Sequence, residues 1–88
     1  MSMTSVAERT VVLPVGKAYH LRFGKDTIIY AGMPADDIYS LVQVKSKGYR
    51  GLGWNLFFSK RQQDITIDGM ELHVIRVTPL QIELRAAA

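Results

Sequence analysis

The last third of the chain alternates apolar and polar residues with a period of two, and this pattern constrains the fold more than any other feature. The segment reads "DITIDGMELHVIRVTPLQIELR". A period of two places successive side chains on opposite faces of a β-strand. Asp68-Gly69 is typical of a two-residue hairpin turn, because both residues tolerate a positive φ, and Thr78-Pro79 marks a second turn. The sequence therefore predicts a three-stranded antiparallel meander.

The alternation changes phase within the second of these strands. Leu72 and Val74 continue one apolar face, but Ile75 and Val77 are apolar in the opposite phase, with the polar Arg76 between them. Two explanations are open. Either a β-bulge lies near residues 74–75, or the strand is buried on both faces.

The first third of the chain also predicts strands. "TVVLPVG" is β-branched and apolar, and Pro14 within it favours an edge strand because proline lacks a backbone donor. "AYHLRFG" alternates, and a turn at residues 24–26 separates it from "TIIYAG". These last two runs predict a hairpin.

Residues 35–45 depart from the strand pattern and predict one short helix. Pro34 suits the first helical position, and Asp36 and Asp37 would lie in the first turn, where the helix dipole favours negative charge. The β-branched Val42 and Val44 leave a strand as the alternative for the second half. The helical spacing places four residues on one face, namely Ile38, Leu41, Val42 and Lys45.

Together these segments predict a mainly β protein, a small barrel or sandwich of about six or seven short antiparallel strands with one inserted helix. Residues 1–9 are expected to be a disordered tail, and residues 10–88 a single domain. The chain has no cysteine, so disulfides and thiolate metal sites are excluded, which fits a reducing cytoplasm. A small strand-rich chain without such supports often completes its core by association, so we expect a homodimer.

Several functional classes find no support in the sequence. No apolar run approaches the roughly 20 residues of a membrane helix, and the N-terminal residues do not form a signal peptide. His20 and His73 stand alone, so we expect no metal site and no cofactor. Asp36 and Asp37 are adjacent, which suits helix capping better than paired acid–base catalysis. Without a nucleophile and its base, we expect no catalytic residues and no enzymatic activity.

Charge is unevenly distributed along the chain, whose formal net charge is +3. Residues 38–63 contain no Asp or Glu. A positive region of this kind concentrates anionic partners, although a solvated face without a ligand is the alternative. The basic residues of this acid-free segment are Lys45, Lys47, Arg50, Lys60 and Arg61.

The centre of that segment, "GYRGLGWNLFFSKR", mixes aromatic and basic residues. Such a mixture suits single-stranded nucleic acid, because cations hold phosphates and aromatic rings stack on bases. Trp54, Leu56 and Phe58 also alternate, which predicts the inward face of a strand instead. Tyr49 and Arg50 are therefore the better candidates for surface contacts.

From Leu56 onward the chain resembles the carbon storage regulator family, whose members bind messenger RNA and control translation. "LFFSKR" resembles that family's first strand, "ITIDG" its second, and "MELHVIRV" and "LQIEL" the next two. The resemblance implies that Ser59, Lys60 and Arg61 line an RNA contact and that two chains interleave. "QQD" replaces the family's first turn, and the family's fifth strand and closing helix have no counterpart.

The functional hypothesis from the sequence is a small regulator that binds single-stranded RNA through its basic residues, with Tyr49 as a stacking partner. The alternative is a non-enzymatic interaction, assembly or inhibitor module whose protein partner is acidic or apolar.

Overall fold

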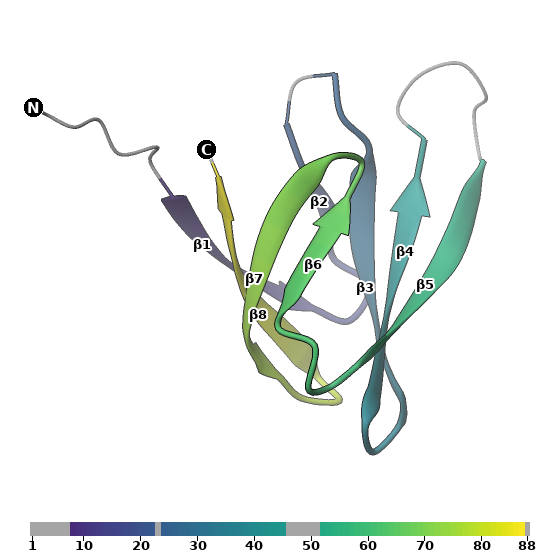
Figure 1. Ribbon diagram of the computed structural model, residues 1–88. Helices are drawn as coiled ribbons and strands as arrows, with labels where there is room; N and C mark the ends of the chain where they lie inside the picture. Colours follow the sequence, from purple (N-terminus) through teal and green to yellow (C-terminus); the bar gives the residue numbers. More distant parts are fainter. Residues whose placement is uncertain (1–7, 23, 46–51, 88) are drawn as a thin grey trace, which may run out of the picture.

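The computed structural model describes residues 8–22, 24–45 and 52–87, which form eight β-strands and contain no helix (Figure 1). Four strands form one antiparallel sheet in the order β1-β8-β7-β6, which we name the terminal sheet. Its members are β1 (Glu8–Pro14), β6 (Asp64–Ile67), β7 (Met70–Val77) and β8 (Gln81–Ala87). The other four form the middle sheet in the order β2-β3-β4-β5. They are β2 (Ala18–His20), β3 (Thr27–Ala35), β4 (Ile38–Val44) and β5 (Gly53–Ser59).

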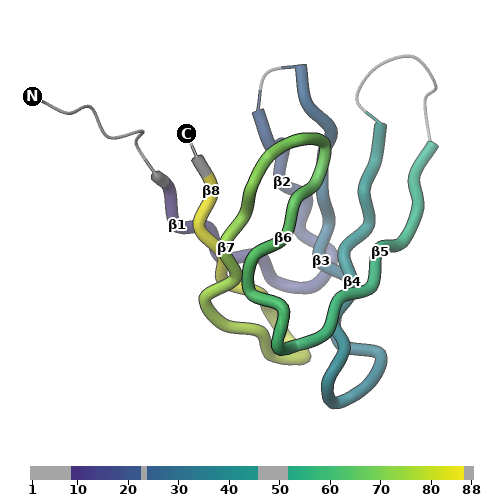
Figure 2. The backbone as a smooth tube through the Cα atoms, in the orientation of Figure 1, coloured from purple at the N-terminus to yellow at the C-terminus, as the bar shows by residue number. Residues whose placement is uncertain are grey.

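The chain passes between the two sheets at two places, from β1 to β2 and from β5 to β6 (Figure 2). The sheets are not closed into a barrel, so of the two predicted architectures the two-sheet arrangement is the one found. Alternate side chains of both sheets meet in one buried core. The middle sheet contributes Ile28, Tyr30, Tyr39 and Leu41, and the terminal sheet contributes chiefly Leu13, Ile65, Ile67, Leu72, Ile82 and Leu84.

The predicted C-terminal meander is confirmed as β6, β7 and β8. Asp68 and Gly69 adopt positive φ values of 51° and 75° between β6 and β7, as this hairpin turn requires. The phase change in β7 is a bulge. Val74 pairs with Leu84, whereas the next paired residue is Arg76, opposite Glu83. The extra residue, Ile75, allows Val74 and Val77 both to be buried.

The predicted helix over residues 35–45 is wrong. Residues 38–44 form β4, a central strand paired with β3 on one side and β5 on the other. Only the tight turn at Asp36 and Asp37 interrupts the strands. The strand alternative suggested by Val42 and Val44 extends to the whole segment, because pairing on both sides satisfies its backbone and favours β-branched residues.

The N-terminal predictions are largely confirmed. Among the described residues β1 is an edge strand that pairs only with β8, as Pro14 indicated, and β2 and β3 form the predicted hairpin. β1 begins at Glu8, so two residues of the predicted 1–9 tail belong to a strand, and residues 1–7 lie outside the described residues.

Candidate anion-binding site

The link between β5 and β6, residues 60–63, is held by backbone hydrogen bonds at both ends. The Lys60 amide donates to the Asp37 carbonyl (2.7 Å), and the Val74 amide donates to the Gln63 carbonyl (2.6 Å). Between these bonds, the buried Tyr39 hydroxyl donates to the Gln62 carbonyl (2.8 Å). The backbone that carries Lys60 and Arg61 is therefore attached to both sheets.

Ser59 contributes to the same link. Its hydroxyl accepts the Arg61 amide (3.2 Å), and its carbonyl accepts the Gln62 amide (2.8 Å). These bonds turn the chain out of β5 and leave the side chains of Lys60 and Arg61 exposed. Ser59, Lys60 and Arg61 thus lie together, with Ser59 fixing the backbone of the turn.

The bulge in β7 brings Arg76 to this link. A pocket of about 310 Å³ is lined by Lys60, Gln63, Val74, Ile75, Arg76 and Val77. Among the described residues that line it, two carry a positive charge and one carries an amide side chain, and none is acidic. Glu83 lies opposite Arg76 in the strand ladder, but no ion pair within 4.0 Å joins Arg76 to a carboxylate in the described part of the chain. This pocket can accept an anion.

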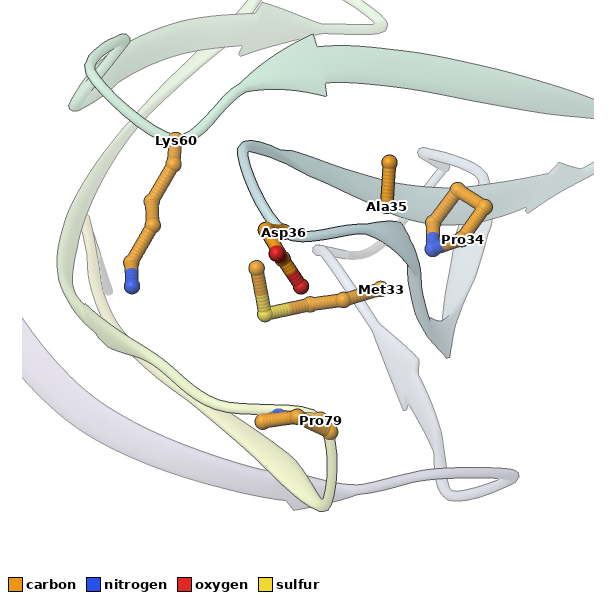
Figure 3. A pocket seen from close by; sticks show the side chains of 6 residues that line it. All are labelled: Met33, Pro34, Ala35, Asp36, Lys60 and Pro79. Carbon is orange, nitrogen blue, oxygen red and sulfur yellow. The ribbon is translucent and has the colours of Figure 1, made fainter.

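Lys60 also borders a second pocket, of about 360 Å³, formed with the β3–β4 hairpin and the β7–β8 turn. Figure 3 shows Lys60 on the β5–β6 link and Asp36 on the facing hairpin, with Pro79 below them. Within the described ranges, Asp36 and Lys60 form no ion pair within 4.0 Å. Lys60 therefore lines both pockets, and the second of them is also lined by Asp36.

Lys45 lies elsewhere. The β4–β5 register places Val44 opposite Gly53 and Ile38 opposite Ser59, so Lys45 and Lys60 are at opposite ends of the pair, roughly 20 Å apart along the strands. Its ammonium Nζ is 3.9 Å from Oδ2 of Asp26, a buried carboxylate that also accepts a bond from Gln43 Nε2 (2.8 Å). Lys45 thus balances a buried charge instead of joining the site at Lys60.

The other predicted contacts, Lys47, Tyr49 and Arg50, lie outside the described residues. Of the five basic residues proposed from the sequence, the described part of the chain brings only Lys60 and Arg61 together. Arg76 was not among the residues predicted from the sequence, although the phase change in its strand left a bulge as one explanation, and a bulge often redirects a side chain at a binding site.

The aromatic residues of β5 divide between its two faces. Leu56 and Phe58 pack against the core as predicted, and the Phe58 ring stacks on Tyr39 with centroids 5.4 Å apart. Trp54 shares their face but is 39% exposed. Phe57 points to the opposite face and is 62% exposed. It was missed as a surface residue, although the same alternation implies it.

The outer faces of the two sheets differ in charge. The terminal sheet carries charged residues of both signs there, including Glu71, Arg76, Glu83 and Arg85. The middle sheet carries uncharged residues at the corresponding positions, including Ala18, Ile29, Val42, Val44, Asn55 and Phe57.

The remaining polar groups of the described residues form no further chemical site. His73 pairs with the exposed Asp64 (2.9 Å) and His20 with the Lys25 carbonyl (2.7 Å). Within the described ranges there is no cluster of three or more potential metal ligands, and no helix able to span a membrane. Comparison with protein-family models, curated proteins and solved structures finds no match to the chain.

Proposed function

We propose that the protein binds single-stranded nucleic acid, preferentially RNA, through phosphates held at the β5–β6 link. The observation that carries the proposal is the arrangement of Lys60, Arg61 and Arg76. All three are exposed, none is within 4.0 Å of a carboxylate in the described part of the chain, and two of them border a pocket whose lining residues include no acid. Unpaired cations of this kind neutralise phosphates and release counterions.

The surroundings of these cations suit a flexible strand. The link is anchored by Asp37, Tyr39 and Val74, so little order has to be imposed on the backbone when a ligand binds. The exposed ring of Phe57 precedes the link by three residues and offers a surface for base stacking. The resemblance of residues 56–88 to an RNA-binding family is the reason for placing RNA before DNA, and control of translation belongs to the same proposal.

The test is fluorescence anisotropy with a labelled single-stranded RNA of mixed sequence, titrated at several salt concentrations from about 50 mM. Lys60→Glu combined with Arg61→Glu should weaken binding at least tenfold at low salt. It should also reduce the slope of log K against log salt by about 0.7 for each phosphate that the variant no longer neutralises. Arg76→Gln should weaken binding less, because it removes one cation and adds no negative charge.

A matched control is Arg9→Glu combined with Lys17→Glu, which changes the net charge equally. These exposed residues lie on β1 and in the β1–β2 turn, at the edge of the sheets opposite β5 and β6. The control should retain most of the affinity. Equal losses in both double variants would mean that overall charge, and not the proposed site, binds RNA. Unchanged binding by folded Lys60→Glu/Arg61→Glu protein would refute the site.

The second candidate function is a protein-interaction module, favoured by the uncharged outer face of the middle sheet. Phe57 lies on this face and is 62% exposed, against 39% for Trp54 on the other face of the same strand. An exposed apolar patch is typical of a protein-binding surface. If the protein binds no RNA or DNA even at about 50 mM salt, this function becomes the better explanation.

A further inference from the structure

The open edge of β5 differs from the other three sheet edges. An exposed edge strand is a template for pairing with another strand, and proteins usually protect it with short length, charge or proline. β2 has three residues and β6 has four, while β1 contains Arg9 and Pro14. β5 has seven residues, "GWNLFFS", with no charged residue and no proline. It is therefore the edge with the least protection against pairing.

The hydrogen-bond pattern identifies which backbone groups of β5 face outward. The Lys45 amide donates to the Leu52 carbonyl (2.9 Å), and the Lys60 amide donates to the Asp37 carbonyl (2.7 Å). Hydrogen-bonded and non-hydrogen-bonded pairs alternate along an antiparallel ladder, so the even-numbered residues of β5 bond to β4. The N–H and C=O groups of Gly53, Asn55 and Phe57 consequently point away from β4.

These outward groups have no hydrogen-bond partner in the described part of the chain, where β5 pairs only with β4. Figure 1 shows β5 at the margin of the middle sheet, with its upper half well separated from the terminal sheet. Beyond Phe57 the edge is no longer fully available for pairing, because the Ser59 carbonyl already accepts a hydrogen bond from the Gln62 amide.

We propose that β5 pairs antiparallel with β5 of a second copy of this chain, around a two-fold axis at Leu56. The two middle sheets would then form one continuous sheet across the dimer. In this register Asn55 lies opposite the partner's Phe57, and Phe57 lies opposite the partner's Asn55. Both are hydrogen-bonded pairs formed by outward-facing groups, as the geometry of the free edge requires.

A second copy suits this edge better than a strand of another protein for two reasons. First, each copy has a net charge of +3, yet β5 brings no charged side chain to the contact, so association places no like charges opposite each other. Second, the register is self-complementary on the inner face, where Trp54 lies opposite the partner's Phe58. Aromatic cross-strand pairs of this kind stabilise antiparallel sheets. The same pairing would cover the part of Trp54 that is exposed in the single chain.

The size of the contact predicts a weak dimer. A seven-residue strand is about 23 Å long, and a sheet with its side chains is about 10 Å thick. The area given by this length and thickness is well below the roughly 800 Å² that each partner buries in a standard interface. The dimer should therefore dissociate on dilution. This proposal does not depend on RNA binding, and its test uses no nucleic acid.

The test is sedimentation equilibrium of the full chain from about 1 µM to about 500 µM, with amide hydrogen exchange measured at both ends of this range. The parent protein should shift from monomer to dimer. As it does so, the amides of Asn55 and Phe57 should become protected. Asn55→Pro removes an outward N–H and leaves the bonds to β4 in place, so it should keep the fold and remain monomeric throughout.

A pair of double variants tests the register. Asn55→Lys with Phe57→Lys places like charges opposite each other in both central pairs, whereas Asn55→Lys with Phe57→Glu places opposite charges there. The first should dimerise at least tenfold more weakly than the second. The proposal is overturned if the parent is monomeric at 500 µM, or if all three variants form dimers as stable as that of the parent.

Discussion

A single tyrosine hydroxyl joins the core to the candidate site. Tyr39 is fully buried, stacks on Phe58 and donates its hydroxyl to the Gln62 carbonyl of the β5–β6 link. Tyr30 makes a similar bond from the middle sheet to the Thr78 carbonyl in the β7–β8 turn (2.6 Å). One bond thus attaches the middle sheet to the β5–β6 link, and the other attaches it to the β7–β8 turn.

Ionisation of Tyr39 should make stability depend on alkaline pH. Burial, and to a smaller extent the charge of Tyr30, raises the pKa of Tyr39 to about 12 from its ordinary value of about 10. Because folding raises this pKa, the protonated Tyr39 hydroxyl stabilises the folded state. This stabilisation is fully present below about pH 10 and is lost as pH rises towards 12. Urea unfolding at a series of pH values should show this decline.

Tyr39→Phe is the matched control for this pH dependence. The variant should be less stable than the parent by about 1 kcal/mol at neutral pH, because the Gln62 carbonyl loses its donor. Its decline between pH 10 and 12 should be shallower than that of the parent. If stability declines equally steeply in both proteins, the pH dependence comes from other groups. One of them is Tyr30, because burial raises its pKa as well.

At the scale of the element, the β3–β4 hairpin depends on one glycine. Gly32 is buried with a φ of 95°, and the register of β3 against β4 shifts on both sides of it. A side chain at this position would have room, since its nearest neighbours, Val15 Cγ2 and the Pro79 carbonyl, would be 3.6 and 3.7 Å away. The constraint is therefore conformational, because residues with a Cβ rarely adopt this φ.

Gly32→Ala should lower the free energy of unfolding by roughly 1–3 kcal/mol, the usual cost of a strained backbone conformation. Chemical denaturation measures this directly. Ala31→Ser is the control, because Ala31 is the exposed neighbour of Gly32 in β3 and its substitution should change stability by less than about 0.5 kcal/mol. If the two variants are equally stable, the irregular pairing of β3 does not require glycine.

At the scale of the whole molecule, the two sheets share one core and should unfold together. Buried side chains of both sheets belong to the same hydrophobic cluster. Trp54, the only tryptophan, reports on the middle sheet, whereas circular dichroism reports on all strands. Since small domains with one core unfold cooperatively, the two signals should give the same urea midpoint. An earlier fluorescence transition would show that the middle sheet, or its β5 edge, opens independently.

The sequence alone determined the features that depend on neighbours along the chain. The period-two pattern located β6, β7 and β8, and the Asp68-Gly69 pair located their first turn. The phase change left a bulge as one of two explanations, and the register of β7 against β8 decided for the bulge. Pro14 indicated an edge strand for the same local reason, since it lacks a donor. Such features follow from backbone preferences and alternation, which a short segment already expresses.

Only the tertiary structure decided the features that depend on distant partners. Residues 38–44 carry both helical spacing and β-branched residues, and they form a strand because β3 and β5 pair with both sides of it. Lys45 and Lys60 belong to one acid-free segment, yet the antiparallel β4–β5 pair carries them to opposite ends of the sheet. Arg76 reaches Lys60 because the bulge in β7 meets the β5–β6 link. The physical reason is that sheet pairing and side-chain clustering join residues far apart in the chain, whose mutual distances no local pattern specifies.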